Sequence, residues 1–314
     1  TPRTALAMDK VRYLGDPVAF VVAETPAQAR DAAEAVHVDI DPLPAVTDAR
    51  AALEAGAPIV YDEVPGNLAL DFQYGDSAKV EAAFASAAHV VRMDMANTRV
   101  VVNAMEPRSA LAEYDADSGK WTLHAGSQGA FPLRNQIARD ILKVEPEKLR
   151  ILTGNVGGSF GMKAAAYPEY PCVLYAAREL GRPVKWTADR SESFLSDAHG
   201  RDHVTRIELA CDRDGTFRAL RTETLANVGA YLSNFSTATP TFLHGTLMAG
   251  PYKTPHVYVN VKAVFTNTVP VDAYRGAGRP EATYSIERVI DKMCDELGLD
   301  PLEVRRRNLL TPDQ

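Results

Sequence analysis

The sequence predicts an α+β fold, in which strands joined by hairpins are mixed with separate helices. Residues 115–119 and 212–215 indicate the hairpins, because each segment ends at a glycine suited to positive φ and lies between stretches of alternating apolar and polar residues. Apolar residues at helical spacing, clearest in 279–297, indicate the helices. A doubly wound sheet would need regularly alternating strands and helices, which this pattern lacks.

Residues 1–60 are predicted to form a first domain. The apolar run 18–23 predicts a buried strand, and the alternating residues 37–40 predict a second. Between them, Thr25 and Pro26 provide an N-cap and a first-turn proline for an alanine-rich helix that reaches about residue 36. Residues 61–75 contain proline and glycine with little periodicity, so they are predicted to be a linker.

Residues 76–314 are predicted to form a larger second domain. Alternating segments predict strands over 89–97, 109–114, 120–125, 149–152, 207–211, 216–225 and 256–265. Helical spacing, caps and terminal glycines predict helices over 76–87, 129–142, 165–180 and 279–297, and one more that starts after Asp300.

Composition excludes several classes of protein. The chain has 314 residues, 46% hydrophobic and 24% charged, with a formal net charge of −7, as in an ordinary globular protein. Its acidic balance and the lack of an apolar run of about 18–20 residues lead us to expect no nucleic-acid partner and no membrane span. Three widely spaced cysteines and no signal peptide favour a cytoplasmic protein without its own iron–sulfur or zinc-ribbon site. The start at Thr1 suggests a processed or trimmed chain.

The most unusual stretch is 153–163, which holds four glycines within eight residues. Glycines leave backbone N–H groups uncovered, so such a loop can approach a bound anion closely. A turn with a purely topological role is the plain alternative. The spacing matches neither the P-loop nor the G-x-G-x-x-G dinucleotide motif.

The same stretch satisfies G-x-S-x-G through Gly157, Ser159 and Gly161, the pattern of a serine hydrolase nucleophile. Asp272 and His256 are the downstream candidates for its partners. Hairpins in place of regular βα units argue against that fold, so a serine hydrolase is kept as an alternative.

Three smaller motifs have ordinary structural readings. His199 and His203 are four residues apart, but Gly200 argues against the helix that a metal site of this spacing would need. Gln128 lies in Gly-Ser-Gln-Gly, where its amide can donate to a ligand oxygen or simply cap a turn. The glycine-rich bend 273–279 carries two arginines that can bind anions or remain solvated.

Taken in order, these motifs resemble the molybdenum-binding large subunit of the molybdenum hydroxylases, the xanthine dehydrogenase and aldehyde oxidase family. Within it, the similarity is greatest to carbon monoxide dehydrogenase-like large subunits. The motifs are Met105-Glu-Pro-Arg108, Gly126-Ser-Gln-Gly129, Gly157-Gly-Ser-Phe-Gly161, Tyr167-Pro-Glu-Tyr-Pro-Cys172, Gly181-Arg-Pro-Val-Lys-Trp186 with Asp189-Arg190, and Ala273-Tyr-Arg-Gly-Ala-Gly278. The resemblance implies an α/β hammerhead module that lacks its start over 1–60, and a first molybdopterin-binding domain over 76–314.

The resemblance also implies a reaction and its cofactors. Molybdenum on a pterin, in the cytosine dinucleotide form, would hydroxylate an aldehyde or an N-heteroaromatic with oxygen from water. Electrons would pass to [2Fe–2S] clusters on a small subunit and to FAD on a medium subunit. No direct protein ligand to the metal is expected.

Residue roles follow from the same resemblance. Gln128 would hydrogen-bond an oxo ligand of the metal, and Arg275 would orient substrate or contact the cofactor, so both are candidate catalytic residues. The bends near Gln128 and Phe160 are expected to converge on one slot. The candidate cofactor-binding residues are Gln128, Gly129, Gly157, Gly158, Ser159, Phe160, Gly161, Arg275 and Gly276.

Three departures from the family pattern limit the function. Gly276 stands where carbon monoxide dehydrogenases have a copper-binding cysteine, which disfavours carbon monoxide oxidation. Ala164 stands where xanthine-oxidising members have a glutamate, which disfavours purines. The family's base glutamate lies in a Gly-x-Gly-Glu motif, and this sequence has no Gly-Glu pair.

We therefore expect the first half of a large subunit. Its other half would be a partner, and the chain alone would neither turn over substrate nor retain molybdenum tightly. A non-catalytic domain of the same fold is a further alternative.

Overall fold

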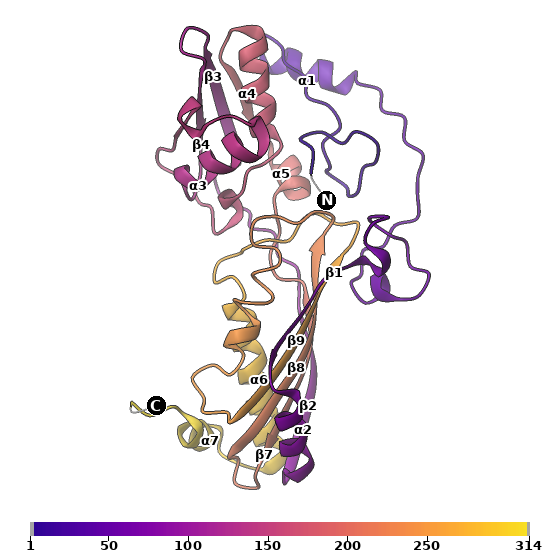
Figure 1. Cartoon of the computed structure of the whole chain (residues 1–314), viewed down its shortest axis with the longest axis vertical. Helices are drawn as coiled ribbons and strands as arrows, with labels where there is room; N and C mark the ends of the chain where they lie inside the picture. Colours follow the sequence, from indigo (N-terminus) through magenta and orange to yellow (C-terminus); the bar gives the residue numbers. More distant parts are fainter. Residues whose placement is uncertain (1–2, 313–314) are drawn as a thin grey trace. The chain divides into compact units, whose positions relative to one another are not determined.

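A computed structural model describes residues 3–312 and confirms the mixed α+β architecture (Figure 1). Contacts within the chain divide it into two compact units. The first unit comprises the residues up to Pro44, Val101–His199 and Asn267–Pro270, and the second comprises Ala45–Val100, Gly200–Thr266 and the residues from Val271 on. The division into domains at 1–60 and 76–314 stays a prediction.

The second unit is built on a five-stranded sheet in the order β1-β9-β8-β7-β2. Its strands are β1 (Leu68–Gly75), β2 (His89–Asn97), β7 (His203–Cys211), β8 (Phe217–Gly229) and β9 (His256–Phe265). Only β8 and β9 run parallel; the other neighbours are antiparallel. The sequence predicted β2 and β9 with the observed bounds, because their apolar residues alternate over nine or more positions.

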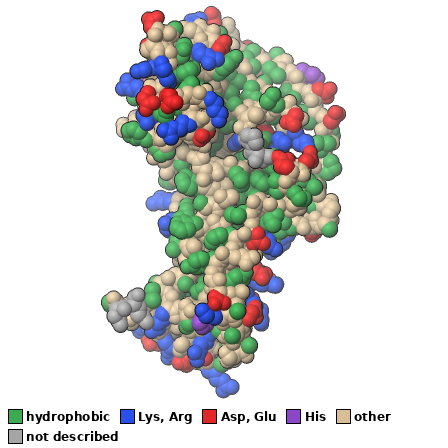
Figure 2. Space-filling model, in the orientation of Figure 1, with side chains coloured by type: hydrophobic (Ala, Val, Ile, Leu, Met, Phe, Trp, Pro, Cys, Tyr) green, Lys and Arg blue, Asp and Glu red, His purple; other side chains and the backbone are tan. Residues whose placement is uncertain are grey.

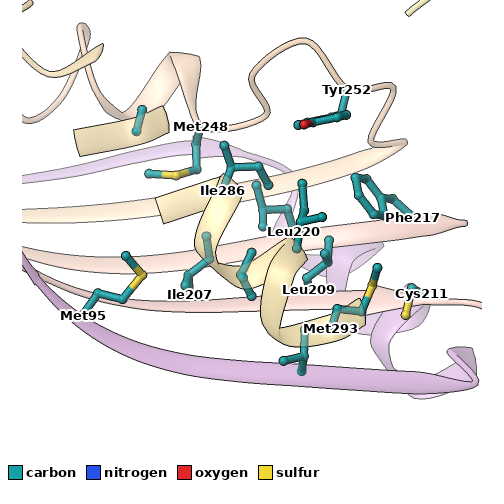
Figure 3. Packing of buried hydrophobic residues seen from close by; sticks show 14 of the residues in the cluster. Met95, Ile207, Leu209, Cys211, Phe217, Leu220, Met248, Tyr252, Ile286 and Met293 are labelled. Atoms are coloured by element: carbon teal, nitrogen blue, oxygen red, sulfur yellow. The ribbon is translucent and has the colours of Figure 1, made fainter. Parts of the chain in front are cut away.

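Helices cover both faces of this sheet. The long helix α6 (Arg279–Leu297) packs its apolar stripe of Ile286, Val289, Ile290 and Met293 against β2, β7 and their neighbours (Figure 3). On the opposite face, α2 (Ser77–Ser86) buries Val80 against β8 and β9. The short helix α7 (Pro301–Asn308) follows, and 3₁₀ turns lie at Ala51–Leu53, Pro65–Asn67 and Gly245–Leu247. Two buried layers therefore fix the register of every central strand.

The first unit contains a four-stranded sheet in the order β5-β4-β3-β6. Its strands are β3 (Ser109–Asp115), β4 (Lys120–Ala125), β5 (Leu149–Leu152) and β6 (Val184–Thr187), and only β4 and β5 are parallel. Helix α4 (Glu169–Leu180) packs on β3 and β6, and α3 (Ala130–Asn135) packs beside β5. The remaining elements are α1 (Pro26–Glu34), the π-helical Gln136–Leu142, α5 (Arg190–Ser196), and 3₁₀ turns at Pro146–Lys148 and Met162–Ala164.

Several predictions near the N-terminus and at the expected linker were wrong. The segments 18–23 and 37–40 form no strand, because no other described segment pairs with them, and most of their side chains are exposed. The helix between them is present as α1, with Thr25 and Gln28 forming a capping box. Part of the expected linker, Leu68–Gly75, is strand β1. The strand β6 and helix α5 were not predicted.

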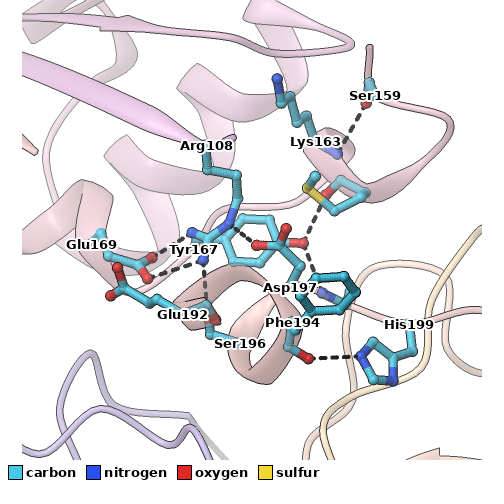
Figure 4. A network of polar contacts seen from close by, with 12 residues as sticks. Arg108, Ser159, Lys163, Tyr167, Glu169, Glu192, Phe194, Ser196, Asp197 and His199 are labelled. Atoms are coloured by element: carbon cyan, nitrogen blue, oxygen red, sulfur yellow. Dashed lines mark hydrogen bonds and ion pairs between the residues drawn. The ribbon is translucent and has the colours of Figure 1, made fainter. Parts of the chain in front are cut away.

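A buried arginine joins three elements of the first unit (Figure 4). The Arg108 side chain is 1% exposed; its Nη1 lies 2.7 Å from Glu169 Oε2, and its Nε lies 2.5 Å from Asp197 Oδ1. The guanidinium also stacks on the ring of Tyr167 at 3.8 Å. Burial alone lowers the pKa of Arg108, but the two carboxylates raise it well above its usual range. The start of β3 is thus held to α4 and to the end of α5.

Acidic and basic side chains are interspersed over the unit that carries β3, β4 and α3 on the face drawn in Figure 2. Among the described residues, no helix has both the length and the apolar character needed to cross a membrane. The cysteines are free thiols, and Cys211 and Cys294 lie in the core of the second unit.

Replacing Arg108 by methionine should destabilise the protein by about 3–5 kcal/mol, because Glu169 and Asp197 would keep buried charges without a counterion. Urea denaturation of the protein that contains this chain measures the loss. The matched control is R178M, which breaks an exposed pair with Glu179 and should cost no more than about 1 kcal/mol. Equal losses for the two variants would contradict this account.

Two buried histidines make the second unit sensitive to acid. His203 and His244 are 2% and 0% exposed, and their rings lie 5.2 Å apart. Burial lowers the pKa of His203 to about 4, and the nearby charge of Arg201 contributes to this shift. Burial lowers the pKa of His244 to about 3, and the neighbouring His203 adds to this shift. Both rings are therefore neutral in the folded protein at neutral pH, whereas in the unfolded chain they bind protons below about pH 6.5.

The free energy of unfolding should therefore fall as the pH drops from about 6.5 toward 4, since the unfolded state gains protons that the folded state excludes. In H203Q this decline should be shallower, which a series of urea denaturation curves at different pH values would measure. The control H37Q removes an exposed histidine and should keep the wild-type slope. An unchanged slope in H203Q would refute the assignment.

Candidate functional site

The glycine-rich loop leaves β5 and reaches the 3₁₀ turn Met162–Ala164 in a conformation that few residues tolerate. Gly158 and Gly161 have φ of 103° and 115°, and Phe160, which is not a glycine, has φ of 52°. Phe160 is also 43% exposed. Backbone strain of this kind persists only where surrounding contacts enforce it, and it is concentrated at functional sites.

Gln128 meets this loop, as the sequence led us to expect. Its side-chain oxygen accepts a hydrogen bond from the Gly161 N–H at 2.7 Å and another from the Ser159 hydroxyl. A backbone N–H can only donate, so the atom that faces Gly161 must be the amide oxygen. The amide nitrogen is consequently directed away from these two donors and can donate to a ligand.

Backbone donors lie beside this amide. The Gly161 N–H donates to Gln128, and the Lys163 N–H donates to the Ser159 hydroxyl within the loop. The N–H groups of Gly158, Ser159 and Phe160 have no hydrogen-bond partner in the part of the chain that the structure describes. Three successive free N–H groups next to a free amide nitrogen form a set of donors suited to an oxygen-rich or anionic ligand.

Two residues to which the sequence analysis gave no role support these donors. The Lys163 side chain is 1% exposed, and its Nζ lies 2.7 Å from Glu106 Oε2. The same carboxylate accepts the Gly157 N–H at 2.8 Å. The Lys163 hydrogen bond, with a smaller contribution from that N–H, lowers the pKa of Glu106. Nothing in the sequence marks these two residues as partners, and only the burial of Lys163 in the structure shows that an acid must lie beside it.

Ser159 is not arranged as a hydrolase nucleophile. Its hydroxyl donates to Gln128, and it accepts the Lys163 N–H at 3.0 Å, as Figure 4 shows for the second contact. No histidine is hydrogen-bonded to it within the described residues. Asp272, a candidate partner, instead accepts the N–H groups of Phe235 and Ala273 in the second unit. The serine hydrolase alternative is therefore not favoured.

Arg275 and Gly276 lie in the second unit, in a bend that precedes α6. Arg201 holds this bend through the Arg275 carbonyl at 2.8 Å, and it pairs with buried Glu281 at 3.0 Å. Gly276, Ala277 and Gly278 all have positive φ, so the bend is strained. The Arg275 side chain is exposed. That these residues join Gln128 in one site stays a prediction.

A cavity of about 450 Å³ opens next to Gln128's bend in the first unit. Its lining includes Glu106, His124, Gly126, Asn155 and Lys185, which belong to segments that meet at the ends of β3, β4 and β5. No group of three or more histidine, cysteine, aspartate or glutamate residues is placed to hold a metal ion among the described residues.

Comparison with known protein families shows which family the chain belongs to. The model of the molybdopterin cofactor-binding domain matches residues 60–309. The chain belongs to this family. The model of the aldehyde oxidase and xanthine dehydrogenase a/b hammerhead domain also matches residues 1–44, so the resemblance to the xanthine dehydrogenase and aldehyde oxidase family is confirmed.

Relatives in this molybdopterin-binding family cover nearly all of the chain. The chain is 37% identical to the 6-hydroxypseudooxynicotine dehydrogenase complex subunit gamma of Paenarthrobacter nicotinovorans. The match covers 98% of the chain and 38% of that relative. The chain is also 35% identical to the carbon monoxide dehydrogenase large chain of Hydrogenophaga pseudoflava, and this match covers 98% of the chain and 40% of that relative. The structure of quinoline 2-oxidoreductase from Pseudomonas putida 86 superposes on the chain with a TM-score of 0.94 at 34% sequence identity. The superposition covers 100% of the chain and 40% of that protein. The chain thus spans about two fifths of these relatives' length.

Changing Gly157 to alanine should distort the loop, because an added Cβ would lie 2.6 Å from Glu106 Cβ. We expect a loss of stability of roughly 1–3 kcal/mol, measured by urea denaturation. Gly154 in the same loop has open space around it and no positive φ, so G154A should leave stability unchanged or slightly higher. If G157A behaved like G154A, the contact between this loop and Glu106 would not be tight.

Proposed function

We propose that this chain forms the part of a molybdenum hydroxylase large subunit that binds one side of the molybdopterin cofactor. One observation carries the proposal: the amide oxygen of Gln128 is engaged by Gly161 and Ser159, so its nitrogen is left to donate beside three free backbone N–H groups. A donor set of this kind suits the oxo group of a metal and the polar edge of a pterin.

The residues present fit that cofactor. Gln128 would donate to an oxygen bound to the metal, and the N–H groups of Gly158, Ser159 and Phe160 would bind the cofactor beside it. Gly129, Gly157 and Gly161 carry no side chain, so we propose that their backbone lies against the cofactor, and Arg275 and Gly276 are proposed as further cofactor-binding residues. When bound, the molybdenum–pterin group turns water into an oxygen nucleophile and accepts two electrons.

The substrate is proposed to be an aldehyde or an N-heteroaromatic. The names of two relatives favour an N-heteroaromatic. Quinoline 2-oxidoreductase is 34% identical to the chain, and the nicotine 6-hydroxylase large subunit of Paenarthrobacter nicotinovorans is 31% identical to it. Ala164 offers no carboxylate to a purine, so it disfavours purines and leaves both proposed classes open. Hydroxylation next to a ring nitrogen is the reaction class we infer.

The complete enzyme is proposed to contain further parts. These are the remainder of the large subunit with the base glutamate, a small subunit with [2Fe–2S] clusters and a medium subunit with FAD, in the cytoplasm. Relatives described as a complex subunit gamma and as a large chain support a multi-subunit enzyme. The cytosine dinucleotide form of the pterin is part of the same proposal.

In the complete enzyme, Gln128→Ala should lower kcat/KM roughly 100-fold, because one donor to developing charge is removed. Steady-state kinetics with an N-heteroaromatic substrate and molybdenum analysis of the same preparation measure the effect. The control Gln73→Ala removes an exposed glutamine on β1 and should leave both unchanged. Unchanged kinetics in Q128A would favour a non-catalytic domain of the same fold, and wild-type enzyme without molybdenum would refute the proposed function.

A further inference from the structure

The ion pair of Glu106 and Lys163 contacts every segment that carries the cofactor donors. Glu106 donates its own N–H to the Gly157 carbonyl at 3.0 Å and accepts the Gly157 N–H at 2.8 Å, so it holds the start of the loop from both sides. At the other end of the loop, the Lys163 N–H donates to the Ser159 hydroxyl at 3.0 Å, and the Lys163 carbonyl accepts the Gln128 N–H at 3.2 Å.

The two bends are shaped to admit this pair. A Cβ on Gly126 would lie 3.5 Å from Glu106 Oε2 and 3.6 Å from Lys163 Nζ, so the backbone of the first bend passes directly over the pair. A Cβ on Gly157 would collide with Glu106 Cβ at 2.6 Å. The backbone of both bends therefore packs against the pair, at ordinary contact distance near Gly126 and without room for a side chain at Gly157.

The energetics argue that this pair does more than stabilise the fold. Lys163 is 1% exposed, so its ammonium has lost nearly all contact with water, whereas the Glu106 side chain stays 38% exposed. Replacing a buried pair by neutral side chains of similar size is often neutral or stabilising. The charges are better explained by what the two side chains do at the loop: the Glu106 carboxylate accepts the Gly157 N–H, and the Lys163 ammonium holds that carboxylate in place.

We propose that Glu106 and Lys163 are positioning residues that set the distance between the Gln128 amide and the N–H groups of loop 157–161, and thereby determine how tightly the cofactor is held. This inference rests on the proposed function and deepens it. The charged side chains act on the loop through Gly157, whereas the contacts to Ser159 and Gln128 are made by the backbone of Lys163, whose position the ion pair fixes. It is the electrostatic support of the donor set rather than part of it.

The test uses the complete enzyme with the variants K163M, E106Q and E106Q/K163M. E106Q should be the least stable, because it leaves the buried ammonium without an acid, and the double variant should regain the wild-type melting temperature. All three should bind the molybdenum cofactor roughly tenfold more weakly, the scale found when groups that support metal ligands are removed, so less molybdenum per polypeptide should remain after dialysis than in the wild type. The Mo(V) EPR signal of the fraction that keeps metal should also shift.

The control is K79M, which breaks the exposed pair of Lys79 and Asp76 and should leave molybdenum content and signal unchanged. The decisive variant is E106Q/K163M, since its fold is expected to be intact. Wild-type molybdenum retention and an unshifted signal in that variant would overturn the positioning role. If wild-type and Q128A enzymes still differed in the same series, the proposed function would stand while this inference failed.

Discussion

A buried cation must be neutralised where it lies, and this constraint organises the first unit. Two cations, Lys163 and Arg108, are each about 1% exposed, and their acids come from different segments of the chain. The short stretch 106–108 takes part in both pairs, since Glu106 neutralises Lys163 and Arg108 is neutralised by Glu169 and Asp197. One turn of backbone before β3 therefore connects the glycine-rich loop to α4 and α5.

Tyr167 links the two clusters. Its ring lies under the Arg108 guanidinium, and its hydroxyl donates to the Met162 carbonyl at 2.8 Å, directly after the loop. The same hydroxyl accepts the Ala198 N–H at 3.1 Å. The end of the loop is thus fixed by Tyr167 from one side and by Lys163 from the other. A loop with positive φ at Phe160 needs such bracing, because its strain must be offset by contacts nearby.

Sequence patterns predicted most elements because their signals are local. Alternation set the bounds of β2, β4 and β9, and helical spacing with a terminal glycine set those of α6. Pairing is not local, so the alternating segment 37–40 was taken as a strand although no described segment pairs with it, and β1 was hidden by the Pro65 and Gly66 before it. Contacts within the candidate site are likewise not local in the sequence, so its patterns predict them less well.

At the candidate site, the meeting of Gln128 with the loop was expected from the family resemblance, whereas the roles of Glu106 and Lys163 were not. These two residues are 57 positions apart, and their charges give no sign in the sequence of being paired. Only burial of the lysine shows that an acid has to lie beside it. Partners of buried charges are therefore the part of such a site that a single sequence reveals least.

The bend at Gly276 has no room for the cysteine that the family resemblance places at this position in carbon monoxide dehydrogenases. Gly276 has φ of 95°, and a Cβ at this position would lie 2.4 Å from Pro280 Cγ. A cysteine would therefore meet both backbone strain and a collision with a rigid ring. The next two residues also have positive φ, so relieving the clash would mean rebuilding the whole bend. Gly276→Cys alone should therefore distort the bend before it could present a thiolate at this position.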